Sequence, residues 1–348
     1  MTDEQRHTTR PDNSPLIVDV HAHHFPAGLP DWSRLTGSPR WPSLLADADG
    51  GGRIMRGEDV FRKVRPPLWD VSARLAELDL AGVGLQVVSP VPVTLTYWAD
   101  AKQAAAYTRE TNDALAADVA ASGGRLIGLG GVPLQDVDAA VEELGRIMSL
   151  PGMYGAEIGT VIADRELDDP GLRPFFGAAQ SLGAALFVHP MDGGTGVIRR
   201  TGQPYEFGMG MLTDTAMAAA ALVFGGVLDD FPGLRIALAH GCGAFPWVYP
   251  RLRLGAGLGS DRPGSAYDEL VRSLWVDALV FDPEHLRLLT RRFGSGHIMV
   301  GTDHPFFPGL LEDVPELVRD AAAHAIITPE QATSVLGTNA LDFLRIKR

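Results

Sequence analysis

Short apolar stretches recur along the chain and alternate with segments of helical periodicity. Each stretch is almost continuously apolar, which is typical of strands that are buried on both faces of a parallel sheet. They cover residues 16–20, 84–90, 125–131, 155–160, 185–190, 235–241, 273–279 and 297–305. The hydrophobic pattern therefore predicts eight buried strands.

Helical patterns lie between most of these strands. The first has apolar residues at Val71, Leu75 and Leu78, spaced i, i+4 and i+7, and Gly82 can end it. Thr328 begins a capping-box pattern near the C-terminus. Further helices are expected over residues 101–121, 136–148, 213–229 and 283–293. Repeated strand–helix alternation predicts an α/β fold, specifically a (β/α)8 TIM barrel.

We expect residues 15–348 to form one barrel domain, because no linker divides them. Residues 1–14 are polar, and we expect a flexible tail there. Residues 24–70 connect the first strand to the first helix without strong periodicity. Long connections of this kind are often active-site covers, so we expect a lid insertion after the first strand. A surface insertion without a catalytic role is the alternative.

Composition narrows the classes of function. With 348 residues, 45% of them hydrophobic, the chain can bury a large core. The formal net charge of −13 argues against binding to nucleic acid or to an anionic membrane surface. We also expect no membrane-spanning helix, because no uninterrupted apolar stretch reaches 18 residues. The single cysteine, Cys242, excludes an internal disulfide and fits a reducing cytoplasm.

Two histidines at the end of the first predicted strand are candidates for metal binding. His21 and His23 stand two positions apart in LIVDVHAHHFP. They therefore project from the same side of an extended strand, toward the barrel interior if Val18 and Val20 pack outward. Two imidazoles on one face supply half of the ligands that a divalent metal ion needs. His24 points the other way, and we expect it to be a structural or lid-contacting residue.

Three further polar residues end other predicted strands. His189 ends the fifth strand, His240 the sixth and Asp303 the eighth. Barrel enzymes place their chemistry at these carboxyl ends. The alternative, separate buried polar groups with separate structural partners, is costly. We expect Cys242 to be a packing residue rather than a nucleophile or a ligand.

The motifs resemble the amidohydrolase superfamily. The ordered segments are DVHAHHFP, LFVHPMD, AHGCGAFP and GTDHPF, with IMRGEDVFR and LWD in the insertion. The resemblance is closest to the branch, called amidohydrolase 2, that contains 2-amino-3-carboxymuconate-6-semialdehyde decarboxylase and γ-resorcylate-type decarboxylases. It extends from about residue 16 to GTNALDFL near the C-terminus.

The resemblance implies one divalent metal ion with water in its open position. The ion is expected to be zinc, with manganese as the alternative. Its ligands would be His21, His23, His189 and Asp303. His240 would act as the catalytic acid and base beside Asp303 and the bound water. Many relatives with two metal ions use a carboxylated lysine as a bridge, but this chain has no lysine between Lys102 and Lys347.

Two arginines complete the implied site. Arg62 would hold a substrate carboxylate. Arg251 would reach the site of a neighbouring subunit, which implies a homodimer. Glu58 stands where bacterial semialdehyde decarboxylases have a basic residue, and Met191 where an aromatic residue is common, so the substrate is less certain than the chemistry.

The expected function is therefore that of a metal-dependent, non-oxidative carboxy-lyase. Its substrate would be a small carboxylic acid, either muconate-semialdehyde-like or aromatic. A metal-dependent hydrolase of a lactone, C–C or amide bond on the same scaffold is the alternative. A metal-binding protein without turnover is a third possibility. Hydration of the substrate and direct protonation of its ring remain open as mechanisms, as do the roles of His304 and Glu157.

Overall fold

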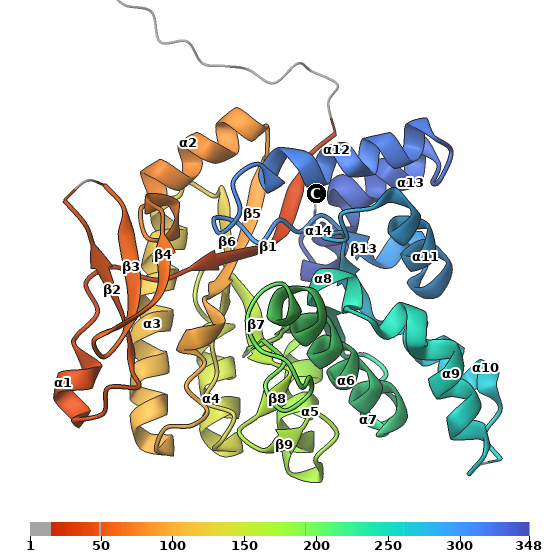
Figure 1. Cartoon of the computed structure of the whole chain (residues 1–348), viewed down its shortest axis with the longest axis horizontal. Coiled ribbons are helices and arrows are strands. Elements are labelled where there is room, and N and C mark those ends of the chain that lie inside the picture. The colour runs from red at the N-terminus through yellow and green to blue at the C-terminus, as the bar shows by residue number, and fades with distance from the viewer. Residues whose placement is uncertain (1–14, 49, 192, 260, 348) are drawn as a thin grey trace, which may run out of the picture.

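Eight parallel strands form a single sheet that closes into a barrel (Figure 1). The computed structural model describes residues 15–48, 50–191, 193–259 and 261–347, so the expected tail at 1–14 lies outside the described residues. The sheet closes where the Val20 amide donates to the Val300 carbonyl at 2.8 Å and the His23 amide to the His304 carbonyl at 2.7 Å. In order, the strands are β1 (Val18–His24), β5 (Leu85–Pro90), β6 (Leu126–Gly130), β7 (Met153–Gly159), β10 (Ala185–His189), β11 (Arg235–Leu238), β12 (Trp275–Asp277) and β13 (Ile298–Met299). The predicted (β/α)8 barrel is confirmed.

Helices surround the barrel, and several begin where the sequence indicates. Asp70 and Asp136 accept hydrogen bonds from the first-turn amides of Ala73 and Ala139, and the capping box at Thr328 is present. The longer helices are α2 (Val71–Ala81), α3 (Ala101–Ala121), α4 (Val137–Ile147), α5 (Arg173–Leu182), α6 (Met211–Phe224), α9 (Phe245–Gly257), α10 (Gly264–Ser273), α11 (Pro283–Phe293) and α12 (Leu310–Ala323). Shorter helices are α1 (Trp32–Thr36), α7 (Val227–Asp230), α8 (Ala239–Cys242), α13 (Pro329–Thr333) and α14 (Asn339–Leu344).

The helix expected over residues 213–229 differs from the prediction in two ways. It breaks at Gly225 and Gly226, where Gly226 adopts a φ of 84°, and α7 follows as a separate turn. It also continues upstream, and Glu206–Phe224 is long and apolar enough to span a membrane by length and composition. The search for an uninterrupted apolar stretch did not reveal this helix, and the expectation that no helix spans a membrane stays a prediction. In this fold 44% of the most apolar stretch of this helix is buried inside the protein. At its end, Phe224 packs on Tyr267, with ring centroids 4.9 Å apart.

Side chains of the barrel strands divide into an inner and an outer layer. The inner layer contains Val87, Ile127, Phe187 and Met299 and is closed at one end by α14. The outer layer packs against the surrounding helices. Val18 and Val20 lie in the inner layer, so the condition on which simple alternation would turn the histidines inward is not met.

A β-bulge in β1 explains how the two histidines nevertheless face inward. The register of β1 against β5 shifts between Asp19 and Ala22. A bulge inserts one extra residue and re-aims the side chains that follow it. His21 and His23 therefore join Val18 and Val20 on the interior side of the strand, and both histidines are fully buried.

Residues 24–70, which we call the insertion, contain a three-stranded antiparallel sheet that the apolar pattern did not predict. Its strands are β2 (Pro42–Ala46), β3 (Gly52–Arg56) and β4 (Asp59–Val64). Trp32 and Trp41 of the insertion pack on Tyr107 of α3, with ring centroids 5.6 and 5.0 Å from that tyrosine. Figure 1 shows this small sheet beside α3, at one side of the barrel. A short hairpin of β8 (Val161–Ile162) and β9 (Arg165–Glu166) follows β7.

Candidate metal centre

Four side chains from three places in the barrel converge at the carboxyl ends of its strands. His21 and His23 come from β1, His189 ends β10, and Asp303 follows β13. One potential ligand atom from each lies within 4.8 Å of all the others, and all four residues are buried. Asp303 Oδ1 is 2.9 Å from His23 Nε2 and 3.6 Å from His21 Nε2. Residues far apart in sequence thus form one compact group.

The imidazole nitrogens that face this group are suited to a metal ion. The Nε2 atoms of His21, His23 and His189 are buried and make no hydrogen bond within the described part of the chain. Leaving three such atoms unsatisfied in the interior is costly. Three imidazole nitrogens and a carboxylate oxygen are a donor set that divalent zinc accepts. The residues therefore fit a single divalent cation.

The other ring nitrogen of each ligand histidine is held by a neighbouring oxygen. His21 Nδ1 lies 2.7 Å from Asp277 Oδ2, His23 Nδ1 lies 3.3 Å from the Pro90 carbonyl, and His189 Nδ1 lies 2.6 Å from the Pro190 carbonyl. A proton on Nδ1 leaves the Nε2 lone pair free to bind a cation. The backbone thus fixes the orientation of two rings, and Asp277 fixes the third.

Asp277, at the end of β12, was not identified from the sequence. Besides His21, its carboxylate accepts the backbone amides of His240 at 2.9 Å, Gly241 at 2.8 Å and Leu279 at 3.1 Å. Its place at the carboxyl end of a barrel strand, in SLWVDAL, is a signal that could have found it. Asp277 couples a ligand histidine to the turn that carries His240.

The turn after β11 explains why glycines stand on either side of Cys242 in the segment AHGCGAFP. His240, Gly241, Cys242 and Gly243 all have positive φ, between 57° and 66°. A Cβ at Gly243 would lie 2.1 Å from the Leu212 carbonyl oxygen, so this glycine is required for close packing as well as for its backbone conformation. The strained turn places the His240 ring 5.3 Å from His21 and 5.2 Å from His189, between ring centroids.

Burial and neighbouring charges set the protonation of the site. Burial lowers the pKa of His240 to about 4, so its imidazole is neutral at neutral pH. For Asp303, burial raises the pKa, but the close approach and positive charge of the neighbouring histidines, His23 first, outweigh it and bring the pKa to about 2. For His21, burial lowers the pKa, but the hydrogen bond and charge of Asp277 outweigh it and raise the pKa to about 9. The carboxylates of Asp303 and Asp277 thus make the cluster a favourable place for a positive charge.

The two arginines of interest lie in different parts of the molecule. Arg62, on β4 of the insertion, lines a cavity of about 70 Å³ together with His23, His189 and Asp303. Its guanidinium carbon stands 4.1 Å from the ring centroid of Phe306. Arg251 is exposed on α9 and lines none of the hollows at the metal-ligand cluster.

Other candidates have their own partners or positions. His24 Nε2 lies 2.8 Å from Asp118 Oδ2 on the outer side of the strand, as its direction predicted. His304 Nε2 lies 3.0 Å from Glu77 Oε2. Glu157 lies outside the group of four ligands, although its Oε2 is 4.0 Å from His23 Nδ1. Its carboxyl group accepts a hydrogen bond from Ser89, and burial raises its pKa to about 8.

Glu58 and Met191, the two residues that depart from the family pattern, also lie in different parts of the molecule. Glu58 is exposed in the tight turn between β3 and β4. Met191 lines the cavity that Arg62 and the ligands share. Met191, and not Glu58, is therefore in contact with the space next to the ligands.

Comparisons with known proteins identify relatives over nearly the whole chain. A family model described as amidohydrolase matches residues 18–346. A 2-amino-3-carboxymuconate-6-semialdehyde decarboxylase from Dictyostelium discoideum is 34% identical over 334 residues, covering 94% of this chain and 91% of the relative.

Two solved structures show the same fold. The 5-carboxyvanillate decarboxylase from Sphingomonas paucimobilis is 26% identical with a TM-score of 0.78, and the match covers 96% of this chain and 100% of that one. A dihydroxybenzoic acid decarboxylase from Polaromonas, solved with bound manganese, is 18% identical with a TM-score of 0.72, covering 96% of this chain and 98% of that one.

Proposed function

This chain belongs to the amidohydrolase family, and from that premise we propose that it is a metal-dependent, non-oxidative decarboxylase. The substrate is a small carboxylic acid, either muconate-semialdehyde-like or aromatic. The observation that carries this proposal is the convergence of three buried imidazole nitrogens and Asp303 beside a cavity that Arg62 also lines. A metal site and a carboxylate-binding arginine in one cavity are what a carboxy-lyase of this kind requires.

The metal ion is held by His21, His23, His189 and Asp303. When bound, it acts as a Lewis acid that lowers the pKa of water or polarises oxygen atoms of the substrate. We propose zinc because the donor set suits it, with manganese as the alternative because the Polaromonas structure contains it. Met191, beside this cavity, is one reason to expect a substrate different from that of the family members with an aromatic residue there.

His240 moves the proton. Decarboxylation replaces a carboxylate with a proton on the same carbon, so the site needs a group that takes a proton from water or from the substrate and delivers it to that carbon. Burial lowers the pKa of His240 to about 4, so at neutral pH its imidazole is unprotonated and has a lone pair that can accept a proton. The turn held by Asp277 keeps the His240 ring beside the ligands. Arg62 orients the acid through its guanidinium group, which can make two parallel hydrogen bonds to a carboxylate. The insertion that carries Arg62 acts as a lid over the site.

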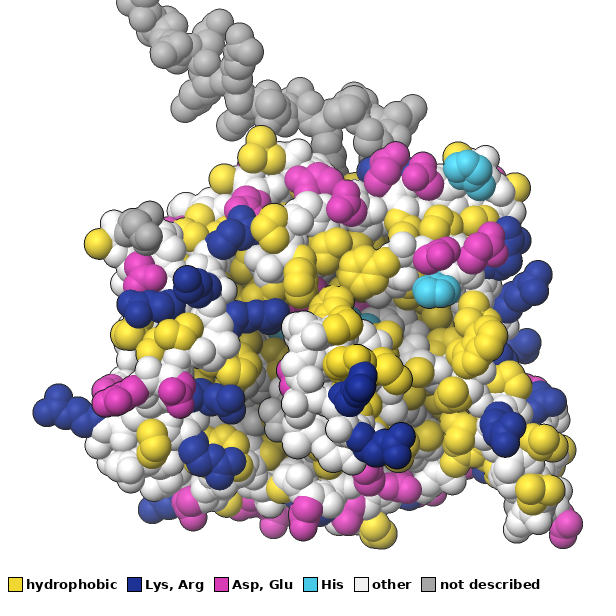
Figure 2. All heavy atoms as spheres, viewed as in Figure 1, with side chains coloured by type: hydrophobic (Ala, Val, Ile, Leu, Met, Phe, Trp, Pro, Cys, Tyr) yellow, Lys and Arg dark blue, Asp and Glu magenta, His cyan; other side chains and the backbone are white. Residues whose placement is uncertain are grey.

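A homodimer is the proposed working unit, in a reducing cytoplasm that suits the single buried Cys242. Arg251 lies on a face of α9 that also exposes Trp247, Leu254 and Leu258, with 80%, 69% and 85% of their surface accessible. Figure 2 shows hydrophobic side chains at the surface in this region. A second copy packed on this face would cover these residues and bring Arg251 toward a neighbouring site. Leu254→Glu should yield monomers in sedimentation velocity, while dimers that persist would contradict this arrangement.

Elemental analysis of the purified protein, combined with a CO2-release screen, tests the proposal. The screen uses carboxylated muconates and hydroxybenzoates. We expect about one divalent ion per chain, and CO2 release from at least one acid that stops when a chelator removes the ion and resumes when zinc or manganese is restored.

Two results would contradict the proposal that this protein is a decarboxylase. One is acid formation from lactones or amides without CO2 release, which indicates a hydrolase. The other is a chain that purifies without metal and binds none when zinc or manganese is added.

A further inference from the structure

A second, larger hollow adjoins the cavity beside the metal ligands. It has a volume of about 590 Å³, against about 70 Å³ for the inner cavity. Phe61, Pro92, Val93 and Met191 line both spaces, so the two are neighbours with a shared wall. Figure 2 shows the surface hollowed left of centre, where the insertion meets the barrel, with Lys and Arg side chains at the rim. The inner cavity is small, so an acid larger than it would extend into the outer hollow.

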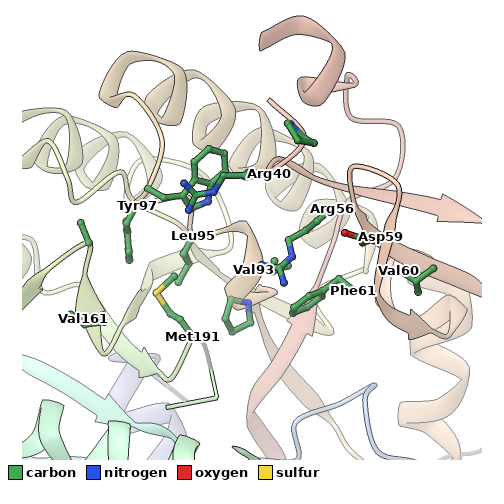
Figure 3. A pocket seen from close by; sticks show the side chains of 14 residues that line it. Arg40, Arg56, Asp59, Val60, Phe61, Val93, Leu95, Tyr97, Val161 and Met191 are labelled. Atoms are coloured by element: carbon green, nitrogen blue, oxygen red, sulfur yellow. The ribbon is translucent and has the colours of Figure 1, made fainter. Parts of the chain in front are cut away.

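Two arginines from separate segments of the insertion line the outer hollow. Arg56 ends β3, and Arg40 precedes β2. The guanidinium carbon of Arg40 lies 4.2 Å from the ring centroid of Trp98, and that of Arg56 lies 4.8 Å from that of Phe61. Figure 3 shows Arg40 and Arg56 entering the same space from different sides. Neither belongs to the set of described residues that form salt bridges.

Stacking on an aromatic ring positions a guanidinium group and leaves its edge free. The ring faces the plane of the group, while the N–H donors point outward along the plane and can bind an anion. Asp59 also lines the hollow but forms no salt bridge with Arg40 or Arg56 among the described residues. Two positive charges and one negative charge therefore leave the wall positive, although the whole chain is strongly negative.

The surface between the arginines and the inner cavity is apolar and aromatic. Leu95, Tyr97 and Val161 line the outer hollow, and Met191 lies at its junction with the inner cavity. A planar or unsaturated carbon skeleton fits such a surface better than a sugar or a polyol, which would leave hydroxyl groups without partners.

We propose that the outer hollow binds the second carboxylate of an elongated diacid. Arg40 and Arg56 hold this distal carboxylate, the apolar wall holds the spacer, and Arg62 holds the carboxylate beside the metal ligands. This inference rests on the proposed decarboxylase and extends it to a class of substrate. Neither arginine touches the ligand cluster, so both act in binding and specificity.

Equilibrium binding to the metal-loaded protein tests the subsite without requiring turnover. Three diacids are each compared with the matching monoacid by calorimetry: terephthalate with benzoate, naphthalene-2,6-dicarboxylate with 2-naphthoate, and biphenyl-4,4′-dicarboxylate with biphenyl-4-carboxylate. We expect at least one diacid to bind about tenfold more tightly than its monoacid, since two exposed arginines, each weakened by solvent, together favour the added carboxylate. The variant carrying Arg40→Gln and Arg56→Gln should lose this preference and keep its affinity for the monoacid.

Arg34→Gln is the matched control, because Arg34 lies on α1 of the same insertion and lines neither hollow. It should keep the full preference for the diacid. The proposed subsite is contradicted if no diacid binds more tightly than its monoacid. It is also contradicted if the preference for the diacid survives in the double variant. Unchanged monoacid binding shows that the double variant is folded. Because no catalysis is measured, a protein that prefers diacids but releases no CO2 would contradict the decarboxylase and leave the subsite in place.

Discussion

The carboxylate of Asp277 accepts a hydrogen bond from His21 Nδ1 at 2.7 Å, and both side chains are fully buried. The same carboxylate accepts the backbone amides of His240 and Gly241. One acidic side chain therefore orients a ligand histidine and also holds the strained turn of the proposed acid and base. The ligand cluster and His240 are in this way parts of one hydrogen-bonded unit.

Replacing Asp277 should weaken metal binding before it affects the fold. Asp277→Asn keeps the size of the side chain but removes the charge that favours the Nδ1 proton of His21. We expect metal affinity to fall about 10- to 100-fold, as for other partners of ligand histidines. Competition with a chromophoric chelator measures this. Asp320→Asn, on the exposed surface of α12, is the control and should bind metal like the wild type. Equal affinities in the two variants would refute the orienting role.

Replacing His240 should separate catalysis from metal binding. His240→Asn removes the proton acceptor but no member of the ligand cluster, so we expect turnover to fall by about 10²–10⁴ with unchanged metal content. Initial rates of CO2 release and elemental analysis of the same preparation measure both quantities. His324→Asn, at the exposed end of α12, should leave both unchanged. Substantial residual activity in His240→Asn would remove the acid and base assignment.

Arg62 should act through the shape of its guanidinium group as well as through its charge. We expect Arg62→Met to lower kcat/KM roughly tenfold or more, and Arg62→Lys to recover only part of this loss, because lysine cannot make two parallel hydrogen bonds or the same stacking contact with Phe306. Steady-state kinetics on an acid found in the screen measures the effect. Arg287→Met, on α11, is the control. If Arg62→Lys were as active as the wild type, charge alone would account for the role of Arg62.

Glu77 should make stability depend on pH in the acidic range. The hydrogen bond from His304, aided by the ion pair with Arg65 at 2.6 Å, lowers the pKa of Glu77 from 4.5 to about 2. A lowered folded-state pKa contributes stability above the unfolded value near 4.5, and this contribution is lost as pH falls toward 2. We therefore expect Glu77→Gln to be less stable than the wild type by about 1 kcal/mol at neutral pH, given its partial exposure.

Urea denaturation across the pH range tests this prediction. The difference between the wild type and Glu77→Gln should be constant above about pH 5 and should shrink below it. Glu316→Gln, which removes an exposed ion pair with Arg319, is the control and should cost less than about 0.5 kcal/mol. A difference that grew at low pH would contradict the linkage.

The fold could be predicted because its strands and helices carry local patterns. Strands buried on both faces need nearly continuous apolar residues, and helices need an apolar face and caps such as Asp136 and Thr328. The insertion did not show such a pattern. The strands β2 to β4 are short and partly exposed, and two of their buried residues, Ile54 and Val64, pack in a cluster that only the folded chain brings together, with Phe25, Leu68 and Val91.

The sequence by itself determined the residue types at the ends of the barrel strands, and its resemblance to amidohydrolases implied a metal site at His21, His23, His189 and Asp303. Only the tertiary structure decided how the side chains point. A bulge in β1 turned both histidines inward, although simple alternation placed Val18 and Val20 on the opposite side. Asp277, and the shared hollow of Arg40 and Arg56, were likewise decided by tertiary contacts. Chain order records which residues follow one another, but hydrogen bonds and cavities depend on which strands and loops become neighbours in space.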